Sequence, residues 1–158
     1  MKNLTHLALA LFLFIATNQA IAQQRGLGLG MIVGEPTGLS VKLWRSPTIA
    51  YDLGLGWSVR NDHNGEQLTK IHVHVDYLLH AFNALQTTET LPLYYGIGGK
   101  FIGGEGDDGS LAIRGVLGLA WQPHQTQLDV FVELAPALQV VPSSTFELDA
   151  AIGFRYFF

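Results

Sequence analysis

Residues 145–158 read TFELDAAIGFRYFF, and this closing stretch decides the fold class. Every second residue from Phe146 to Phe158 is apolar, whereas the alternate phase carries Glu147, Asp149 and Arg155 among small residues. An alternation with period two predicts a β-strand that has one apolar face. The end of the chain is therefore expected to be a strand in a sheet.

The same alternation recurs through the chain, between clusters of turn-forming residues. No segment has the 3.6-residue periodicity of an amphipathic helix. We therefore predict an all-β protein whose eight strands span 26–34, 37–45, 48–59, 70–82, 91–103, 110–122, 128–141 and 145–158.

The composition of the non-apolar phase indicates which face of the sheet is buried. The chain has 18 glycines and only 14% charged residues, so this phase is too poor in charge for a normal wet surface. A soluble barrel or sandwich would need that wet surface. The inverse arrangement, with the apolar phase facing lipid and the polar phase facing a lumen, is typical of an outer-membrane barrel. We therefore predict an eight-stranded antiparallel up-and-down transmembrane β-barrel.

The first 22 residues have the features of an export signal. Lys2 supplies a positive charge, an apolar stretch follows from Leu7 to Ala16, and Ala20 and Ala22 have the spacing of a cleavage site. The alternative, an N-terminal membrane anchor, requires a longer apolar run. We expect a cleaved signal peptide at 1–22 and one barrel domain at 23–158.

Charge and cysteine content exclude several classes of function. The net charge of −4 argues against a nucleic-acid partner, and the absence of cysteine excludes disulfides, thiol nucleophiles and cysteine-ligated metals. The glycines at 26, 28 and 30 lack the spacing of a dinucleotide fingerprint, so no cofactor is predicted.

Eight strands enclose a lumen that side chains just fill, and inward glycines leave room for long charged residues. Charges in such a lumen must be paired, which predicts a salt-bridged interior that conducts nothing. The predicted interior charge cluster is Lys42, Asp52, Asp76, Lys100, Arg114, Glu133, Asp149 and Arg155.

Aromatic residues near the strand ends are expected to form two interfacial belts. The residues of one belt are Tyr51, Trp121, Tyr156 and Phe158, and those of the other are Trp57, Tyr95 and Phe101.

With these features the chain resembles the small eight-stranded barrels of the OmpA-transmembrane and OmpX type. The C-terminal GFRYFF is similar to the insertion signal of that class, carried here by Phe154, Tyr156 and Phe158. The segments at 26–30 and 34–42 resemble the first hairpin of functionally unassigned outer-membrane barrels. The resemblance implies two partners, outer-membrane lipids and the barrel insertion machinery. It also implies periplasmic termini, so that the connections at 35–36, 60–69, 104–109 and 142–144 face outward.

Two groups of residues suggest ion binding. His72, His74 and Asp76 share one strand face and could ligate a zinc or copper ion, or form part of a polar lumen. Glu105, Asp107 and Asp108 lie in a glycine-rich segment that could take a divalent ion, or be a solvated hairpin.

We predict a monomeric outer-membrane barrel with a structural or envelope-integrity role and no enzymatic activity. The alternatives are a barrel that binds or transports a small solute or ion, and a lipid-modifying enzyme. The enzyme alternative would draw on Ser58, Ser110, Ser143 and Ser144 with His63, although none of them lies in a catalytic motif.

Overall fold

The computed structural model describes residues 26–61, 67–85, 87–104, 107–123 and 126–158, and in these ranges the chain is entirely strands and turns. The strands are β1 (Leu27–Gly34), β2 (Gly38–Trp44), β3 (Ile49–Asn61), β4 (Gln67–Ala81), β5 (Leu93–Gly104), β6 (Asp107–Trp121), β7 (Leu128–Val141) and β8 (Thr145–Phe157). Among the described residues, no helix has the length and hydropathy needed to cross a bilayer.

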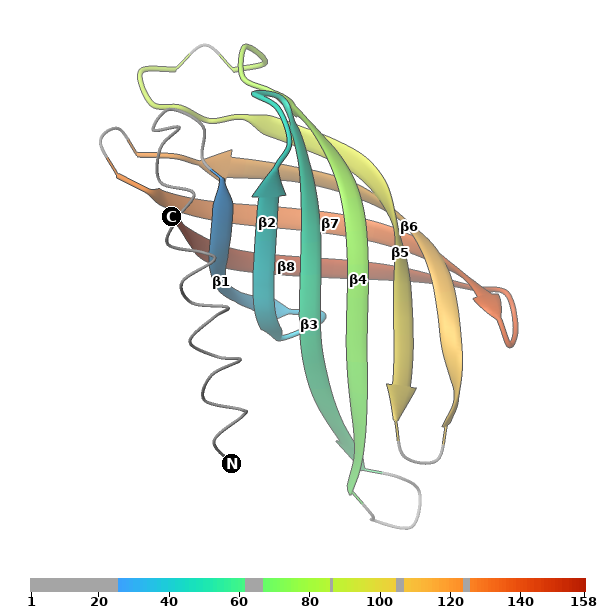
Figure 1. The fold of residues 1–158 in the computed structure, drawn as a ribbon. Coiled ribbons are helices and arrows are strands. Elements are labelled where there is room, and N and C mark those ends of the chain that lie inside the picture. The colour runs from blue at the N-terminus through green and yellow to red at the C-terminus, as the bar shows by residue number, and fades with distance from the viewer. Residues whose placement is uncertain (1–25, 62–66, 86, 105–106, 124–125) are drawn as a thin grey trace, which may run out of the picture.

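The eight strands form one closed antiparallel barrel in which each strand pairs with its neighbour in sequence (Figure 1). β1 completes the ring by pairing with β8, in a register that sets Gly30 opposite Arg155. Closure leaves the sheet without an edge over these paired residues. The prediction of an eight-stranded antiparallel barrel is confirmed.

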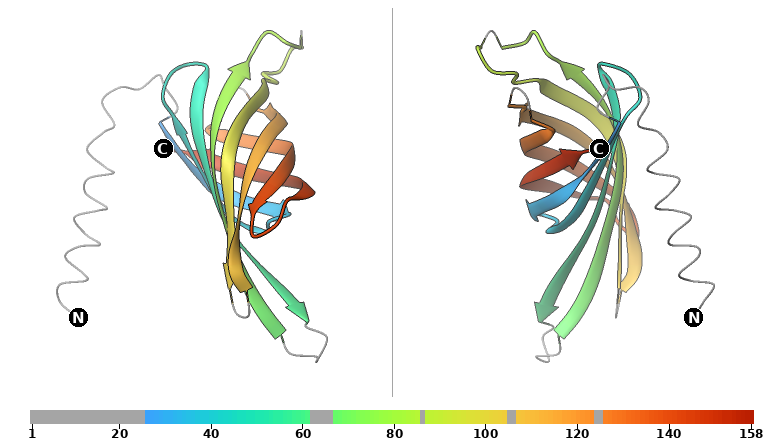
Figure 2. Two further views of the ribbon diagram at one scale, coloured as in Figure 1. Left: turned by 90° about the vertical axis from the view of Figure 1, so that its right-hand side faces the viewer. Right: turned by 60° about the vertical axis from the view of Figure 1, so that its left-hand side comes forward.

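The wall of the barrel is uneven in height. We call the end where β1 begins and β8 ends the terminal end, and the opposite end the distal end. β1 has 8 residues and β2 has 7, whereas β4 and β6 have 15 each. The β3–β4 and β5–β6 hairpins extend past the short strands at the distal end (Figure 2).

The predicted distal connections at 60–69 and 104–109 were too long. β3 continues to Asn61, where it pairs with Gln67 of β4, and Gly104 of β5 pairs with Asp107 of β6. Polar and glycine residues in these segments resemble loop sequence, but backbone pairing with the adjacent strand extends the ladder through them.

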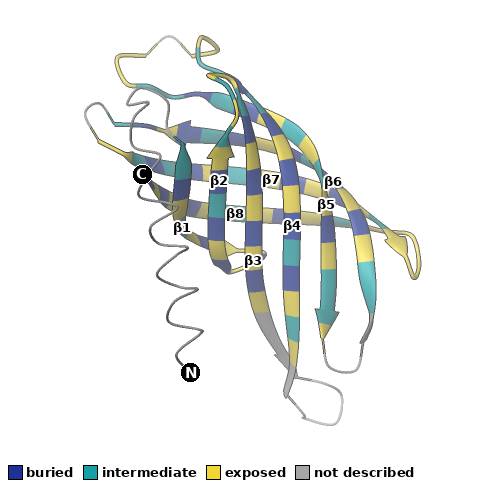
Figure 3. Cartoon of the chain, viewed as in Figure 1, coloured by how far each residue is buried: buried dark blue, intermediate teal, exposed yellow. Residues whose placement is uncertain are grey.

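Burial alternates along every strand, as the banding in Figure 3 shows. The exposed face is apolar on all eight strands, and its larger members include Leu29, Leu39, Leu53, Ile71, Ile97, Ile113, Leu134 and Phe154. The buried face carries charged, small and aromatic residues. The distribution is the reverse of that in a water-soluble barrel.

Inward glycines make room for the large side chains of the lumen, as the sequence suggested. A Cβ at Gly54 would overlap the His74 ring, and one at Gly118 would overlap the Tyr94 ring. Glycine on one strand therefore accommodates a bulky residue on the adjacent strand.

Aromatic residues lie near both ends of the outward face, with one correction to the prediction. Tyr95 lies at the terminal end, because it pairs with Leu79 near the end of β4 and with Leu117 of β6. The grouping of Tyr95 with Trp57 and Phe101 was wrong, because β5 begins at the terminal end and Tyr95 lies two residues from its first residue, Leu93. Trp57 and Phe101 lie toward the distal end, and Tyr51 packs edge-on against Tyr77, with 5.6 Å between ring centroids, toward the terminal end.

Candidate functional site: a lumen filled by two ion-pair clusters

The lumen contains all eight residues of the interior charge cluster predicted from the sequence. Seven of them are buried and the carboxylate of Glu133 is nearly so. They reach the lumen from β2 to β8, because each belongs to the inward phase of its strand. They separate into two clusters of ion pairs.

The first cluster lies toward the terminal end, and we call it the terminal cluster (Lys42, Asp52, Asp129 and Arg155, with Ser40). The Arg155 guanidinium donates through Nη2 to Asp52 and through Nε to Ser40 Oγ, the latter at 2.7 Å. Asp129 is shared, with its Oδ2 3.8 Å from Lys42 Nζ and 3.9 Å from Arg155 Nη1.

Burial of these charges is favourable only because they are paired. The Arg155 guanidinium also stacks on Phe131, with Cζ 3.8 Å from the ring centroid, which adds a cation–π contact.

The second cluster extends toward the distal end, and we call it the distal cluster (Asp76, Lys100, Arg114, Glu133, Glu147 and Asp149). Arg114 Nη2 donates to Glu133 at 2.7 Å, and its Nε lies 3.3 Å from Asp76. Lys100 Nζ lies 2.9 Å from both Glu147 and Asp149. Asp149 joins the two cations, because its Oδ2 is also 3.8 Å from Arg114 Nη1.

Several lumen residues were not predicted from the sequence. Asp129 and Glu147 complete the clusters, and the signal that could have found them is phase: Asp129 has the parity of Glu133, and Glu147 that of Asp149. Tyr94 donates to Glu133 Oε2 at 3.0 Å, and its inward position also follows from period-two alternation.

An aromatic layer closes the lumen at the terminal end. The Trp44 and His80 ring centroids are 4.3 Å apart, and those of His80 and Tyr94 are 5.3 Å apart. Lys42 Nζ lies 4.7 Å from the Tyr94 ring centroid, so this layer packs against the terminal cluster. The rings leave the charged lumen shielded from that end.

The candidate metal ligands His72, His74 and Asp76 all belong to the inward phase of β4 and are buried. His74 Nε2 lies 3.7 Å from Asp76 Oδ2, and Asp76 also faces Arg114. Among the residues that the structure describes, no group of three or more His, Asp or Glu side chains is placed to hold a metal ion. The geometry therefore favours the alternative of a polar lumen.

The candidate divalent-ion loop is not a loop as predicted, because Asp107 pairs with Gly104 and begins β6. Glu105 and the side chains of Asp107 and Asp108 lie outside the described residues. Of the enzyme candidates, Ser110 lies on β6, and Ser143 and Ser144 lie in the β7–β8 turn. His63 and the Ser58 side chain also lie outside the described part of the chain.

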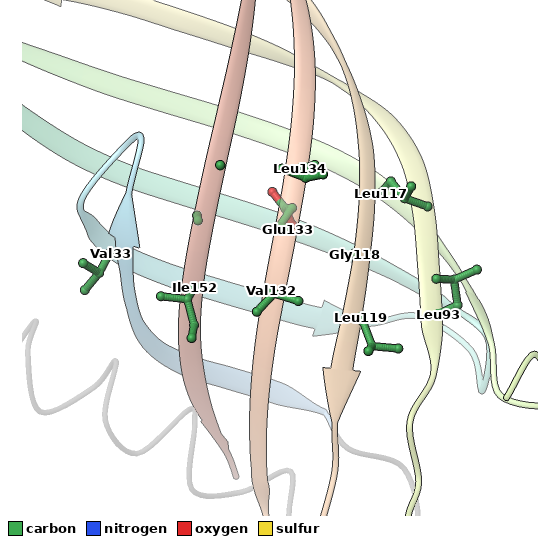
Figure 4. A pocket seen from close by; sticks show the side chains of 11 residues that line it. Val33, Leu93, Leu117, Gly118, Leu119, Val132, Glu133, Leu134 and Ile152 are labelled. Carbon is green, nitrogen blue, oxygen red and sulfur yellow. The ribbon is translucent and has the colours of Figure 1, made fainter. Parts of the chain in front are cut away.

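The outward face carries a shallow apolar groove of about 540 Å³ (Figure 4). Its walls come from five neighbouring strands, β5 to β8 and β1, and include Leu93, Leu117, Val132, Leu134, Ile152 and Val33. The groove belongs to the exposed apolar surface, and Glu133 is the one charged residue among those that line it.

The residues of the predicted insertion signal lie on the outward side at the end of β8. Phe154, Tyr156 and Phe158 are each about half exposed, and the rings of Tyr156 and Phe158 meet edge-on with centroids 5.2 Å apart.

The chain was compared with protein-family models, with curated proteins and with solved structures, and none of the three comparisons gives a match.

Proposed function

We propose that this protein is an integral barrel of the bacterial outer membrane, with a structural role in the envelope and a lumen that does not conduct ions. The observation that carries the proposal is the exposed face. Large apolar side chains stand outward on all eight strands of a closed sheet, with exposed fractions from 38% for Tyr77 to 69% for Phe146. An apolar surface on this scale is unfavourable in water and favourable in lipid.

The closure of the sheet also supports the proposal that the barrel lies in lipid. A backbone that crosses lipid must satisfy its own hydrogen bonds, and a closed ladder does so at every paired position. Pairing of β1 with β8 over Gly28 to Gly34 provides that closure.

The contents of the lumen support the proposal that it does not conduct ions. Four cations and six carboxylates are joined across it by ion pairs of 4.0 Å or less, and the aromatic layer lies over their terminal side. Moving an ion through this lumen would require breaking buried pairs, each of which is costly to separate. This argues against the solute-transport alternative.

The predicted signal peptide at 1–22 lies outside the described residues, and export through it is part of the proposal. The monomeric state, and the barrel insertion machinery as a partner, are also parts of the proposal. The resemblance of the C-terminal aromatic residues to an insertion signal and the exposure of Tyr156 and Phe158 support that partner.

Membrane fractionation tests the location. We expect the mature chain in the outer-membrane fraction, at an electrophoretic position that shifts when the sample is boiled, because a closed ladder resists detergent until heated. A soluble periplasmic protein without a shift would overturn the proposal.

Planar-bilayer recording tests the closed lumen separately. Purified protein should give no single-channel steps, and regular ion conductance would establish the transport alternative.

A further inference from the structure

A small cavity in the lumen is lined by residues of both the terminal and the distal cluster. Its polar lining comes from both: Ser40 and Arg155 of the terminal cluster, and Arg114 and Glu133 of the distal cluster, together with His74. Apolar atoms of Ile32, Phe131 and Ala151 complete the walls, and Glu35 and Pro36 of the β1–β2 turn cover it.

The covering turn is held firmly in place. Pro36 is buried, and a Cβ at Gly56 would overlap its ring. The Thr37 hydroxyl accepts from Gly34 N at 3.1 Å and donates to Gly34 O at 3.0 Å. The cavity is therefore enclosed from the distal end by an ordered turn.

Three of the residues that line the cavity have buried polar atoms with unfilled hydrogen-bonding capacity. Arg114 Nη1, Arg155 Nη1 and His74 Nδ1 have no hydrogen-bond partner among the described residues. Each guanidinium nitrogen has only a distant carboxylate, at 3.8 Å for Arg114 and 3.9 Å for Arg155. Buried groups of this kind are nearly always satisfied by a protein atom or an ordered water.

Size and charge select the ligand. About 10 Å³ is open to the centre of a water molecule, which is the room that one buried water needs. An added anion is disfavoured because Arg114 and Arg155 already face five carboxylates within 4.0 Å. A cation is disfavoured by the two guanidinium groups on the lining.

We propose that one internal water molecule occupies this cavity and joins the terminal cluster to the distal cluster, accepting hydrogen bonds from the two arginines. A water can accept from two N–H groups and still donate to carboxylate oxygens such as those of Glu133. The terminal and distal clusters then form one connected hydrogen-bond network. The proposal depends on the lumen geometry and not on the membrane in which the barrel resides.

Ala151→Val tests the site, because Ala151 lines the cavity and an added side chain would fill it. Ala150→Val is the matched control, since Ala150 is the adjacent residue of β8 and is exposed on the outward face. The mature chain would be refolded in detergent micelles and its long-lived internal waters counted by oxygen-17 relaxation dispersion.

We expect the count for Ala151→Val to be lower by about one than the counts for the wild type and for Ala150→Val. Equal counts in all three proteins would overturn the water site. If Ala151→Val does not refold, Ala151→Ser replaces it, because its hydroxyl would take the water's place and should give the same loss.

A double-mutant cycle tests the connection. Asp52→Asn and Glu133→Gln alter one carboxylate in each cluster, and their effects on the unfolding equilibrium constant should be non-additive by roughly threefold to tenfold. This excess should fall below about twofold in the Ala151→Val background and persist with Ala150→Val. Persistence in both backgrounds would show that direct charge interaction, and not a shared water, couples the clusters.

Discussion

Arg155 is the side chain on which the terminal cluster depends. It donates to Asp52 and Ser40, lies near Asp129 and stacks on Phe131, and it is fully buried. Removing it leaves two carboxylates buried with only Lys42 as a close cation. Uncompensated charge of this kind is among the largest single causes of destabilisation.

Arg155→Ala should therefore lower the free energy of unfolding by about 3–5 kcal/mol. Urea denaturation of the protein folded in lipid vesicles measures this change. Arg45→Ala is the control, because Arg45 is exposed in the β2–β3 turn, and it should change stability by less than about 0.5 kcal/mol. Equal denaturation midpoints for Arg155→Ala and wild type would contradict the view that the paired charges of the lumen stabilise the barrel.

The β1–β8 pairing is the element on which closure depends, and Gly30 is its tightest point. A Cβ at Gly30 would meet the Phe154 carbonyl oxygen and the Arg155 Cα, both of which are backbone atoms of β8. Backbone cannot rotate away as a side-chain tip can, so the two strands would have to separate.

Gly30→Val should accordingly destabilise the barrel by at least about 1–3 kcal/mol and reduce the fraction that shows the heat-dependent electrophoretic shift. Gly99→Val is the matched control on β5, where a Cβ would have only one atom within 4 Å, at 3.9 Å. If both variants shift as fully as the wild type does, close approach at the β1–β8 pairing does not limit folding.

Period-two alternation predicted the elements well, because each strand has one continuous apolar phase. β7 has the predicted bounds, and β8 differs only at its last residue. The errors concern ends and pairings. Residues 60–61, 67–69 and 107–109 look like loop by composition, and only the adjacent strand's backbone makes them strand.

The interior charges could be predicted by phase, but their partners could not. Lys100 pairs with Glu147 and Asp149 across the lumen, from a strand that is not its neighbour in the sheet. Such contacts depend on barrel diameter and strand tilt, which alternation does not specify. Asp129 was missed because it is only the second residue of the predicted strand at 128–141, next to a turn, where an exposed carboxylate is the usual expectation.

At the scale of the whole molecule, the lumen resembles a solid core more than a channel. The two clusters, the aromatic layer and the turn at Pro36 all lie within it. The stability of the barrel should therefore come from the polar interior as well as from the hydrogen bonds of the sheet. The outward face contacts only the medium around the barrel, which we propose is lipid.

The uneven wall would have a consequence for the bilayer that we propose surrounds the barrel. With a rise of about 3.3 Å per residue and a tilt of about 45°, the 8 residues of β1 span about 19 Å of height, whereas the 15 residues of β4 span about 35 Å. An outer-membrane barrel usually presents an apolar band about 25 Å tall. The β1–β2 side is too short for that band.

Folding should therefore be faster and more complete in short-chain than in long-chain phosphatidylcholine vesicles, as followed by the heat-dependent electrophoretic shift. A thicker hydrocarbon layer must deform around β1 and β2, and each ångström of mismatch has a cost. Identical folding yields in both lipids would show that the barrel tilts to remove the mismatch.

In a membrane, the short β1–β2 side of the wall would keep the bilayer beside it locally thin. Lipids beside β1, β2 and the β1–β8 pairing would be compressed and disordered, while those beside β3 to β6 would keep their full length. The protein would carry this gradient of thickness with it, so that the pairing of β1 with β8 would lie where the bilayer is thinnest.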